Sequence, residues 1–179
     1  PVVSSGITVS SETVNGSQTI QSDGKAVSTT IVLGGTQIVD SYGTAVNTII
    51  DKGGFQYISP SGVGQVDKMS AGGTQMLGSV GAFGRIFGGT GIIEKMGEGL
   101  QYVGPGGSGI IKEMYGGTQE THCDHAIDNQ TKIFYDPLEV RIETMYGGTQ
   151  LELLEFTNFP VSINHMLGGT QIIGSTTYY

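Results

Sequence analysis

The sequence predicts an all-β protein, a parallel β-solenoid of about eight coils of roughly 18–19 residues with loop insertions. Three observations lead to this fold class. A Gly-Gly-Thr-Gln motif recurs along the chain, and glycine accounts for 31 of the 179 residues. Val, Ile and Thr are frequent, which is typical of strands separated by tight turns. No segment shows the 3.6-residue apolar spacing of an amphipathic helix.

The motif returns at a nearly constant interval. Exact copies begin at Gly34, Gly72, Gly116, Gly147 and Gly168, and looser copies begin at Asn15, Gly53 and Glu98. The first four glutamines are evenly spaced, and the step from Gln101 to Gln119 is shorter by one. The three remaining steps are longer, and each is interpreted as one repeat plus an inserted loop. The complete set of glutamines is Gln18, Gln37, Gln56, Gln75, Gln101, Gln119, Gln150 and Gln171.

One clean repeat shows the expected unit of strand, loop and strand. Residues 37–39 form a short strand, and residues 40–43 form a turn in which Gly43 allows a positive φ. Residues 45–50 form a longer strand, and Gly53-Gly54 turns the chain back. Successive circuits would stack in parallel about 4.8 Å apart.

Stacking places each residue type above its counterpart in the previous coil. We expect one apolar interior ladder before the glycine turns and another two residues after the glutamines. The first ladder is Ile31, Ile50, Met69, Met96, Met114, Met145 and Met166, and the second is Ile20, Val39, Ile58, Leu77, Val103 and Ile173. Gln37 and Val39 face the same way on a regular strand, so the glutamines are expected to form an interior or corner ladder of hydrogen-bonded amides.

Three segments depart from this pattern within the single domain of residues 1–179. Residues 1–13 hold no copy of the motif and are expected to form an irregular lead-in or a cap. Residues 122–139 are interpreted as a loop insertion. Leu151-Glu152-Leu153 places apolar residues one position off the earlier register, so this coil is either distorted or differently lined.

Composition limits the partners of the protein. The net charge is −8, from 8 Lys and Arg against 16 Asp and Glu, so nucleic acid and anionic membranes are poor partners. The single cysteine, Cys123, excludes an internal disulfide. No segment approaches the roughly 20 apolar residues of a membrane span, and no signal-peptide pattern opens the chain at Pro1.

Chemistry-bearing side chains are sparse. His122-Cys123-Asp124-His125 is the densest cluster of ligand-type residues, with Asp128 and His165 as further ligands only if folding brings them near. A structural zinc site needs about four ligands at suitable spacing, so a solvated polar loop is favoured and no metal or cofactor is predicted. Asp40, Asp51 and Asp67 occur singly, and the closer set Glu139, Glu143, Glu152 and Glu155 is interpreted as an exposed acidic face rather than a catalytic group.

The repeat resembles a known family. Gly-Gly-Thr-Gln followed by Ile or Val, and then Gly-Thr-Ala-Val-Asn-Thr, is similar to the strand–loop–strand (AIDA-type) repeats of autotransporter passenger domains, the diffuse-adherence and self-associating adhesins of Gram-negative bacteria. The resemblance covers residues 14–120 well and residues 140–173 partly. It implies a right-handed parallel β-helix at the cell surface, adhesion or self-association, and O-glycosylation of Ser and Thr by a heptosyltransferase.

The sequence therefore favours a non-enzymatic adhesive module whose partners are further copies of itself or a host receptor or glycan. Its outward faces are expected to carry Thr, Asn, Ser, Asp and Lys more than large apolar groups. A compatible hypothesis makes the chain a glycosyltransferase substrate, with Ser28, Thr44, Thr48 and Ser61 as candidate acceptors on outward positions. The alternative of a different class is a polysaccharide-binding or polysaccharide-processing β-helix, such as a phage tail component.

Overall fold

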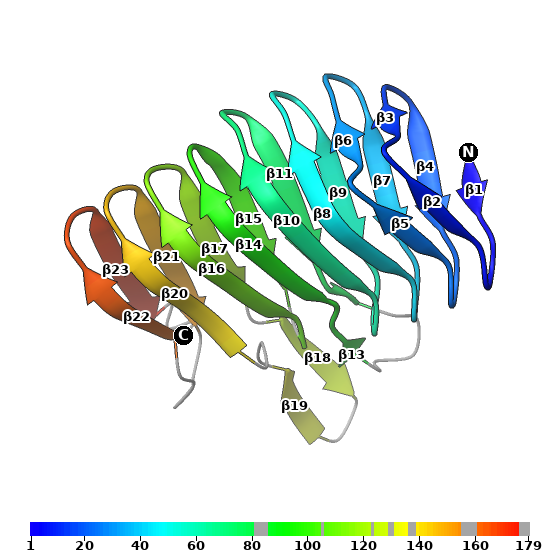
Figure 1. Ribbon diagram of the computed structural model, residues 1–179. Helices are drawn as coiled ribbons and strands as arrows, with labels where there is room; N and C mark the ends of the chain where they lie inside the picture. Colours follow the sequence, from blue (N-terminus) through cyan, green and yellow to red (C-terminus); the bar gives the residue numbers. More distant parts are fainter. Residues whose placement is uncertain are drawn as a thin grey trace.

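A computed structural model shows a stack of coils in which each coil contributes one strand to each of two sheets (Figure 1). It describes residues 1–80, 86–104, 106–122, 124–128, 131–135, 139–154 and 161–175. Every regular element in those ranges is a strand. The strands of each of these two sheets pair in parallel, so the chain forms a parallel β-solenoid.

The first sheet, called here the glutamine sheet, has nine strands. In order they are β1 (Val2–Val3), β4 (Ser17–Ile20), β7 (Thr36–Val39), β9 (Phe55–Ile58), β11 (Gly73–Leu77), β15 (Gly99–Val103), β17 (Thr118–His122), β21 (Thr149–Leu154) and β23 (Thr170–Ser175).

The second sheet lies on the other side of the core. Its main path is β2 (Thr8–Ser10), β5 (Lys25–Val27), β8 (Thr44–Ile50), β10 (Val63–Met69), β14 (Thr90–Met96), β16 (Ser108–Met114), β20 (Glu139–Met145) and β22 (Val161–Met166), with β3 (Thr13–Val14) and β6 (Thr30–Ile31) beside it. The two sheets give eight complete coils followed by β23.

The inserted residues leave the register of the glutamine sheet unchanged. Gln75 pairs with Gln101, and Gln119 pairs with Gln150, although the sequence steps there are 26 and 31 residues. Two antiparallel hairpins belong to these insertions: β12 (Ser79–Val80) with β13 (Ile86–Phe87), and β18 (Asp124–Asp128) with β19 (Thr131–Tyr135). The β18–β19 hairpin projects from one edge of the stack, at the bottom of Figure 1.

Two apolar columns fill the core. The first runs from Ile31 through the methionines to Met145, and the second runs from Ile20 to Val103 along the glutamine sheet. The last members are exceptions, because Met166 is 48% exposed and Ile173 is 67% exposed. Both belong to the final strands of the described chain, where no further described coil packs against them.

The second column faces small residues across the core. Ala26, Ala45, Gly64, Gly91 and Gly109 follow one another in register in the second sheet. A Cβ atom added to Gly91 would lie 2.5 Å from Leu77 Cδ2. The sheets approach closely at this level, and glycine occupies the coils in which the facing side chain fills the space.

Residues 1–13 form paired strands, so of the two expectations, an irregular lead-in or a cap, the irregular lead-in is not found. Strand β1 pairs with β4, with Val2 opposite Thr19, and β2 pairs with β5, with Thr8 opposite Lys25. The segment forms most of a first coil without the glutamine motif, because backbone pairing requires β conformation and no particular side chain.

The coil after Gln150 keeps its register and is lined differently, which selects one of the two expected alternatives. Thr121 pairs with Glu152, and Glu152 pairs with Ile173, so Glu152 continues the column of Val103. The side chain of Glu152 is only 3% exposed. Leu151 is half-buried in the outward row, and a carboxyl group takes the interior position.

Candidate functional site

The turns that follow β1, β4, β7 and β9 stack on one another, and the first three present hydroxyl groups in a column. Ser5, Ser22 and Ser41 occupy equivalent positions in the first three turns, and all three are exposed. The next residue of each later turn has positive φ: Asp23 at 59°, Tyr42 at 62° and Ser61 at 61°. Such values are uncommon for residues other than glycine.

Backbone hydrogen bonds hold these turns in line. The amide of Asp23 donates to the carbonyl of Tyr42 over 3.2 Å, and the amide of Tyr42 donates to the carbonyl of Ser61 over 3.3 Å. Each turn is therefore fixed by the turn of the next coil. The repeated backbone presents Ser5, Ser22 and Ser41 to solvent in the same way on successive coils, which defines the serine column.

The predicted acceptor residues fall into different environments. Ser61 and Ser28 are exposed at turns, and Thr44 is half-buried on β8. Ser28 has a φ of 57° and belongs to a second stacked series with Ser11 and Asn47. These three predicted positions keep their hydroxyl groups within reach of solvent.

Thr48 is not an outward position, which corrects its assignment as an acceptor. Its side chain is 0% exposed, and its Oγ1 has no hydrogen-bond partner in the described structure. The cause is a bulge in β8: Ala45 pairs with Gly64 and Thr48 pairs with Val66, so β8 has one extra residue there. The extra residue, Asn47, has a φ of 54° and turns Thr48 into the core.

Sequence reasoning missed the serine column. The signal was present, because Ser22 and Ser41 have the same spacing as Gln18 and Gln37, and each serine stands two positions before a glycine. Turn positions that repeat with the period of the coil could have been aligned in the same way as the glutamines.

The glutamines form a buried ladder through the solenoid. The seven from Gln18 to Gln150 are 0% exposed, and Gln171 in the last described strand is exposed. From Gln37 onward, each Nε2 donates to Oε1 of the glutamine in the previous coil over 2.7–2.9 Å. In three coils Nε2 also reaches a glycine carbonyl of the second sheet, as from Gln75 to Gly64 at 3.3 Å.

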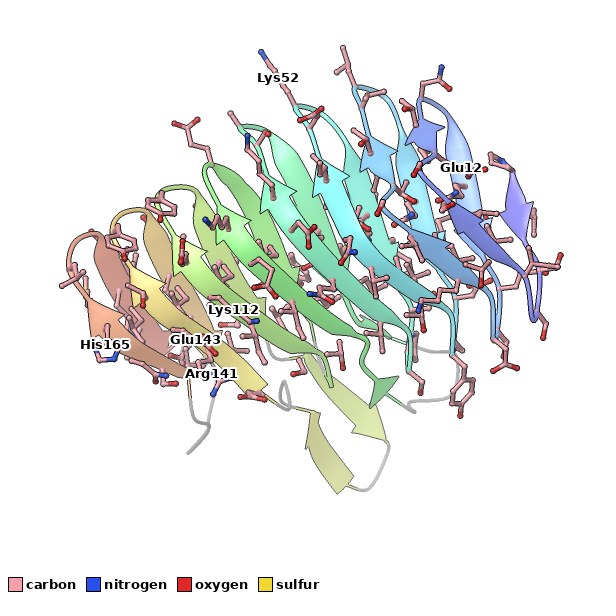
Figure 2. The ribbon with its side chains drawn as sticks, in the orientation of Figure 1. Glu12, Lys52, Lys112, Arg141, Glu143 and His165 are labelled. Carbon is pink, nitrogen blue, oxygen red and sulfur yellow. The ribbon has the colours of Figure 1, made fainter. Side chains whose placement is uncertain are left out.

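The ladder begins at a carboxylate. Nε2 of Gln18 donates to Oε2 of Glu12, which lies near the first coil (Figure 2). Two single side-chain hydrogen bonds accompany it: Ser59 donates to Asp40 over 3.4 Å, and Ser70 donates to Asp51 over 3.2 Å. These contacts join adjacent coils, so we assign the glutamines to the scaffold and not to a reaction.

The described carboxylates do not gather into a catalytic group. Asp40 and Asp51 bond to serines on separate turns, and Glu139 and Glu143 both pair with Arg141, at 3.6 and 3.3 Å. Burial raises the pKa of Glu152, which lies in the core column. The expectation that Glu152 belongs to an exposed acidic face is therefore wrong, because its side chain is buried in the core.

Metal ligation is not supported by the described residues, among which no group of three or more His, Cys, Asp or Glu could hold an ion. His165 is exposed on β22 (Figure 2). The structure does not describe the side chains of His122, Cys123, Asp124, His125 and Asp128, and it does not describe residue Glu155.

Within the described ranges, no helix is long and apolar enough to span a bilayer.

The outward face of the glutamine sheet carries large apolar residues beside Ser and Thr, so the expectation of mainly polar outward faces holds for only part of this sheet. The positions directly after the glutamines include Ile38, Tyr57, Met76, Tyr102, Leu151 and Ile172, and the positions directly before them include Phe55 and Leu100. Most of these side chains are half-buried against one another, and Ile172 is 47% exposed. We call these residues the apolar face.

The second sheet carries the charged outward side chains. Lys112 Nζ lies 2.8 Å from Glu94 Oε1, and Lys95 Nζ lies 3.9 Å from Glu113 Oε2. The hydrogen bond to Glu94 and the negative charge of Glu94 raise the pKa of Lys112. Lys112, Glu143 and Arg141 lie close together on β16 and β20 in Figure 2. The two outward faces therefore differ in chemistry.

Comparisons with known proteins add one informative likeness. No protein-family model matches the chain, and no curated protein matches it. Among solved structures, the chain is similar to the crystal structure of a TibC-catalysed hyper-glycosylated fragment of TibA, with 25% sequence identity and a TM-score of 0.60. The likeness covers 97% of this chain, which spans 57% of that fragment.

Proposed function

We propose that this chain is a non-enzymatic adhesive module of the cell surface and an acceptor for O-linked sugar. It has the repeat and the fold of the strand–loop–strand passenger domains of Gram-negative adhesin autotransporters. The proposal covers both roles because they use different surfaces. The turns supply hydroxyl groups, and the sheet faces supply extended contact surfaces.

The serine column is the observation that carries the acceptor role. Ser5, Ser22 and Ser41 are exposed on turns that share one backbone geometry. A glycosyltransferase that recognises this geometry could modify successive coils without reading a different sequence at each one. The hyper-glycosylated state of the TibA fragment supports this role, and the resemblance to the family suggests a heptosyltransferase as the partner enzyme.

Co-expression with a heptosyltransferase tests the acceptor role. Intact mass should increase by whole sugar units, and peptide mapping should place sugars on the serine column and on exposed or half-buried positions such as Ser28, Thr44 and Ser61. Replacing Ser5, Ser22 and Ser41 with alanine should remove several units. Thr48→Val is the matched control, because Thr48 is buried and its loss should leave the sugar count unchanged.

Two results would contradict the acceptor role. One is the absence of sugar from every Ser and Thr of the co-expressed chain. The other is an equal loss of sugar in the serine-column variant and in Thr48→Val, since that result would show that the enzyme does not select exposed turns.

Adhesion is tested by displaying the chain on cells. We expect displayed copies to make cells clump with one another, or to bind a host receptor or glycan. Contacts that are individually weak add up when many copies face one another, so clumping does not require a strong single site. Cells that display the chain and neither clump nor bind host surfaces would leave only the acceptor role.

A further inference from the structure

Two tyrosines stack on the glycine turns, which lead from the second sheet back to the glutamine sheet along the upper edge of Figure 1. Lys52 marks the same edge in Figure 2. Tyr115 and Tyr146 each follow the methionine that ends a strand of the second sheet, and their ring centroids lie 4.8 Å apart with an interplanar angle of 6°. The two residues are nevertheless 51% and 46% exposed, so ring surface remains available to a ligand.

The rings are held in a fixed orientation. The hydroxyl group of Tyr115 donates to Oε2 of Glu113 over 2.8 Å, and the ring of Tyr146 lies parallel to the ring of Tyr115. Side chains that are already ordered in the free protein lose less conformational entropy when a ligand binds. The pair therefore provides a preformed, flat aromatic surface.

The position beside Tyr115 in the preceding coil carries no side chain. Gly97 occupies it, since Gly97 and Tyr115 each follow a methionine at paired positions of β14 and β16. A Cβ atom on Gly97 would have only the carbonyl oxygen of Met69 within 4 Å, at 3.4 Å. Because Tyr146 stacks on Tyr115 from the following coil, the opposite face of the Tyr115 ring borders this open position, which we call the Gly97 gap.

Polar groups border the Gly97 gap on its other side. Ser70 precedes Gly97 by one coil in the same row, and its Oγ donates to Oδ1 of Asp51 over 3.2 Å. Glu98 is exposed directly after Gly97 and leans toward the turn of Tyr115. Two coil steps of about 4.8 Å separate Ser70 from Tyr115, about 10 Å in all, which accommodates one six-membered sugar ring stacked on the tyrosine.

This combination of groups matches a neutral sugar. One face of a pyranose ring presents C–H groups that pack on an aromatic ring, and its rim presents hydroxyl groups that donate and accept hydrogen bonds. The Gly97 gap offers the ring face of Tyr115, the hydroxyl group of Ser70 and the carboxylate of Glu98. An aromatic wall with a few polar groups is the usual composition of small-molecule sites.

A cation is the other ligand that an aromatic ring beside carboxylates attracts. Glu113, however, already accepts from Tyr115 and lies 3.9 Å from Nζ of Lys95. The carboxylate of Asp51 likewise accepts from Ser70. Two of the three carboxylates near the gap therefore have partners within the chain, which favours an uncharged ligand over a cation.

We propose that Tyr115 and the Gly97 gap form a binding site for a neutral hexopyranose unit of a surface glycan. This inference rests on the proposed adhesive function and names the chemical class of one partner and its site. The site lies on the edge opposite the serine column, because the glycine turns follow strands of the second sheet and the serine turns follow strands of the glutamine sheet. Glycosylation of the serine column thus leaves the site accessible.

Saturation-transfer NMR of the purified chain tests the site. The probes are the methyl glycosides of galactose, glucose and mannose, and at least one should bind with a dissociation constant on the order of 1 mM. Tyr115→Leu keeps apolar bulk but removes the ring, and should weaken binding at least fivefold. Tyr42→Leu is the matched control, because Tyr42 is 68% exposed on the opposite edge, and it should bind like wild type.

Gly97→Val is the sharper variant, because it fills the gap and leaves both tyrosines in place. Gly97 does not have a positive φ, and an added Cβ meets no close contact, so the variant should fold like wild type. It should also weaken sugar binding at least fivefold. Far-UV circular dichroism verifies folding, and Gly97→Val keeps the test decisive if Tyr115→Leu does not fold.

The outcomes separate the inference from the proposed function. Weaker sugar binding in both site variants, with unchanged binding in Tyr42→Leu, supports the site. Absence of binding to all three sugars overturns it, as does unchanged binding by Gly97→Val. Choline is the cationic probe, and Tyr115-dependent binding of choline without sugar binding also overturns the inference.

Display on cells tests the adhesive function by itself. Cells that display wild type and adhere, although the purified chain binds none of the sugars, retain the adhesive function and reject this site. Cells that display wild type and neither clump nor bind host surfaces reject the adhesive function, whatever the purified chain binds.

Discussion

Nε2 of Gln101 donates a hydrogen bond of 2.8 Å to Oε1 of Gln75, although 26 residues separate them in the sequence. The residues that lengthen this step lie outside the amide ladder, so the ladder continues across the insertion. The same holds between Gln119 and Gln150, which are 31 residues apart and bonded at 2.9 Å. Hydrogen bonding between glutamines therefore fixes how successive coils align, independently of what leaves the stack between them.

Removing an internal glutamine should cost far more stability than removing the last one. Gln56 is buried, donates to Gln37 and accepts from Gln75. Gln56→Ala removes the donor to Oε1 of Gln37 and leaves Nε2 of Gln75 with only the carbonyl of Gly64, and should lower the free energy of unfolding by about 2–4 kcal/mol. Gln171→Ala removes one bond from an exposed residue and should cost less than about 1 kcal/mol. Denaturant titration followed by circular dichroism measures both, and equal costs would exclude a stabilising amide ladder.

Glu152 should make stability fall with rising pH. Burial raises the pKa of Glu152 in the folded chain, so the folded chain binds this proton more tightly than the unfolded chain does. Its contribution is most favourable below the unfolded pKa and is lost as the pH rises through the raised folded pKa. Glu152→Gln should remove this slope and stabilise the protein at pH 7 by about 1 kcal/mol.

Chemical denaturation of wild type and Glu152→Gln between pH 4 and 8 separates the contribution of Glu152 to the pH dependence of stability from the contributions of the other carboxylates. Glu120→Gln is a useful comparison, because Glu120 is half-buried in the outward row of the preceding coil. Parallel pH profiles for wild type and Glu152→Gln would show that Glu152 is not the source of the slope.

A methyl group on Gly91 should disrupt the core. Its Cβ would lie 2.5 Å from Leu77 Cδ2 and 2.7 Å from Gln75 Oε1. Gly91→Ala should therefore cost about 1–3 kcal/mol. Gly16→Ala is the control, since nothing lies within 4 Å of an added Cβ there, and its effect should be neutral or slightly stabilising.

Removing the side chain that crowds the added methyl group tests the cause. A valine is still too large at this level, since a Cβ on Gly109 would lie 2.4 Å from Val103 Cγ2. Leu77→Ala should therefore cost less stability in the Gly91→Ala background than in wild type. Thermal or denaturant unfolding measures both costs, and equal costs in the two backgrounds would contradict the crowding of residue 91 by Leu77.

Salt should promote association of the purified chain. The net charge of −8 opposes the approach of two copies, and ions screen exposed charges beyond about 8–10 Å at physiological strength. Raising salt from about 10 to about 150 mM should therefore increase the association constant, because it screens this repulsion between like-charged copies. Analytical ultracentrifugation across this range measures the trend, and association that weakens steadily with salt would indicate an ion-paired interface instead.

Sequence reasoning reached the stacked coils because their periodicity is direct. Gln18, Gln37, Gln56 and Gln75 recur at one interval, and the same residue type at one interval implies the same place in each coil. Thr48 could not be placed in this way, since the bulge at Asn47 exchanges inside and outside locally. A single positive φ decides that exchange, and composition does not reveal it.

Hydrophobicity alone predicts neither the outward position of the apolar face nor the burial of Glu152, because strand residues alternate between the two sides of the sheet. Ile38 and Tyr57 look like core residues by hydrophobicity, yet they stand one position after the glutamines and point outward. Glu152 looks like a surface residue by charge, yet it stands two positions after Gln150 and is buried. Position relative to the glutamine, rather than polarity, determined the side of the sheet on which each side chain lies.

The carboxylate of Glu12 stands at one end of a series of aligned dipoles. Every glutamine amide donates toward the first coil, and those from Gln18 to Gln150 also accept from the following coil, so the eight side-chain dipoles point in the same direction and add. An amide dipole is about 3.5 D, and aligned amides leave positive partial charge at the donor end. The interior of the solenoid consequently has an electrical axis of its own, distinct from the net charge of the surface, and Glu12 places a negative charge at its positive pole.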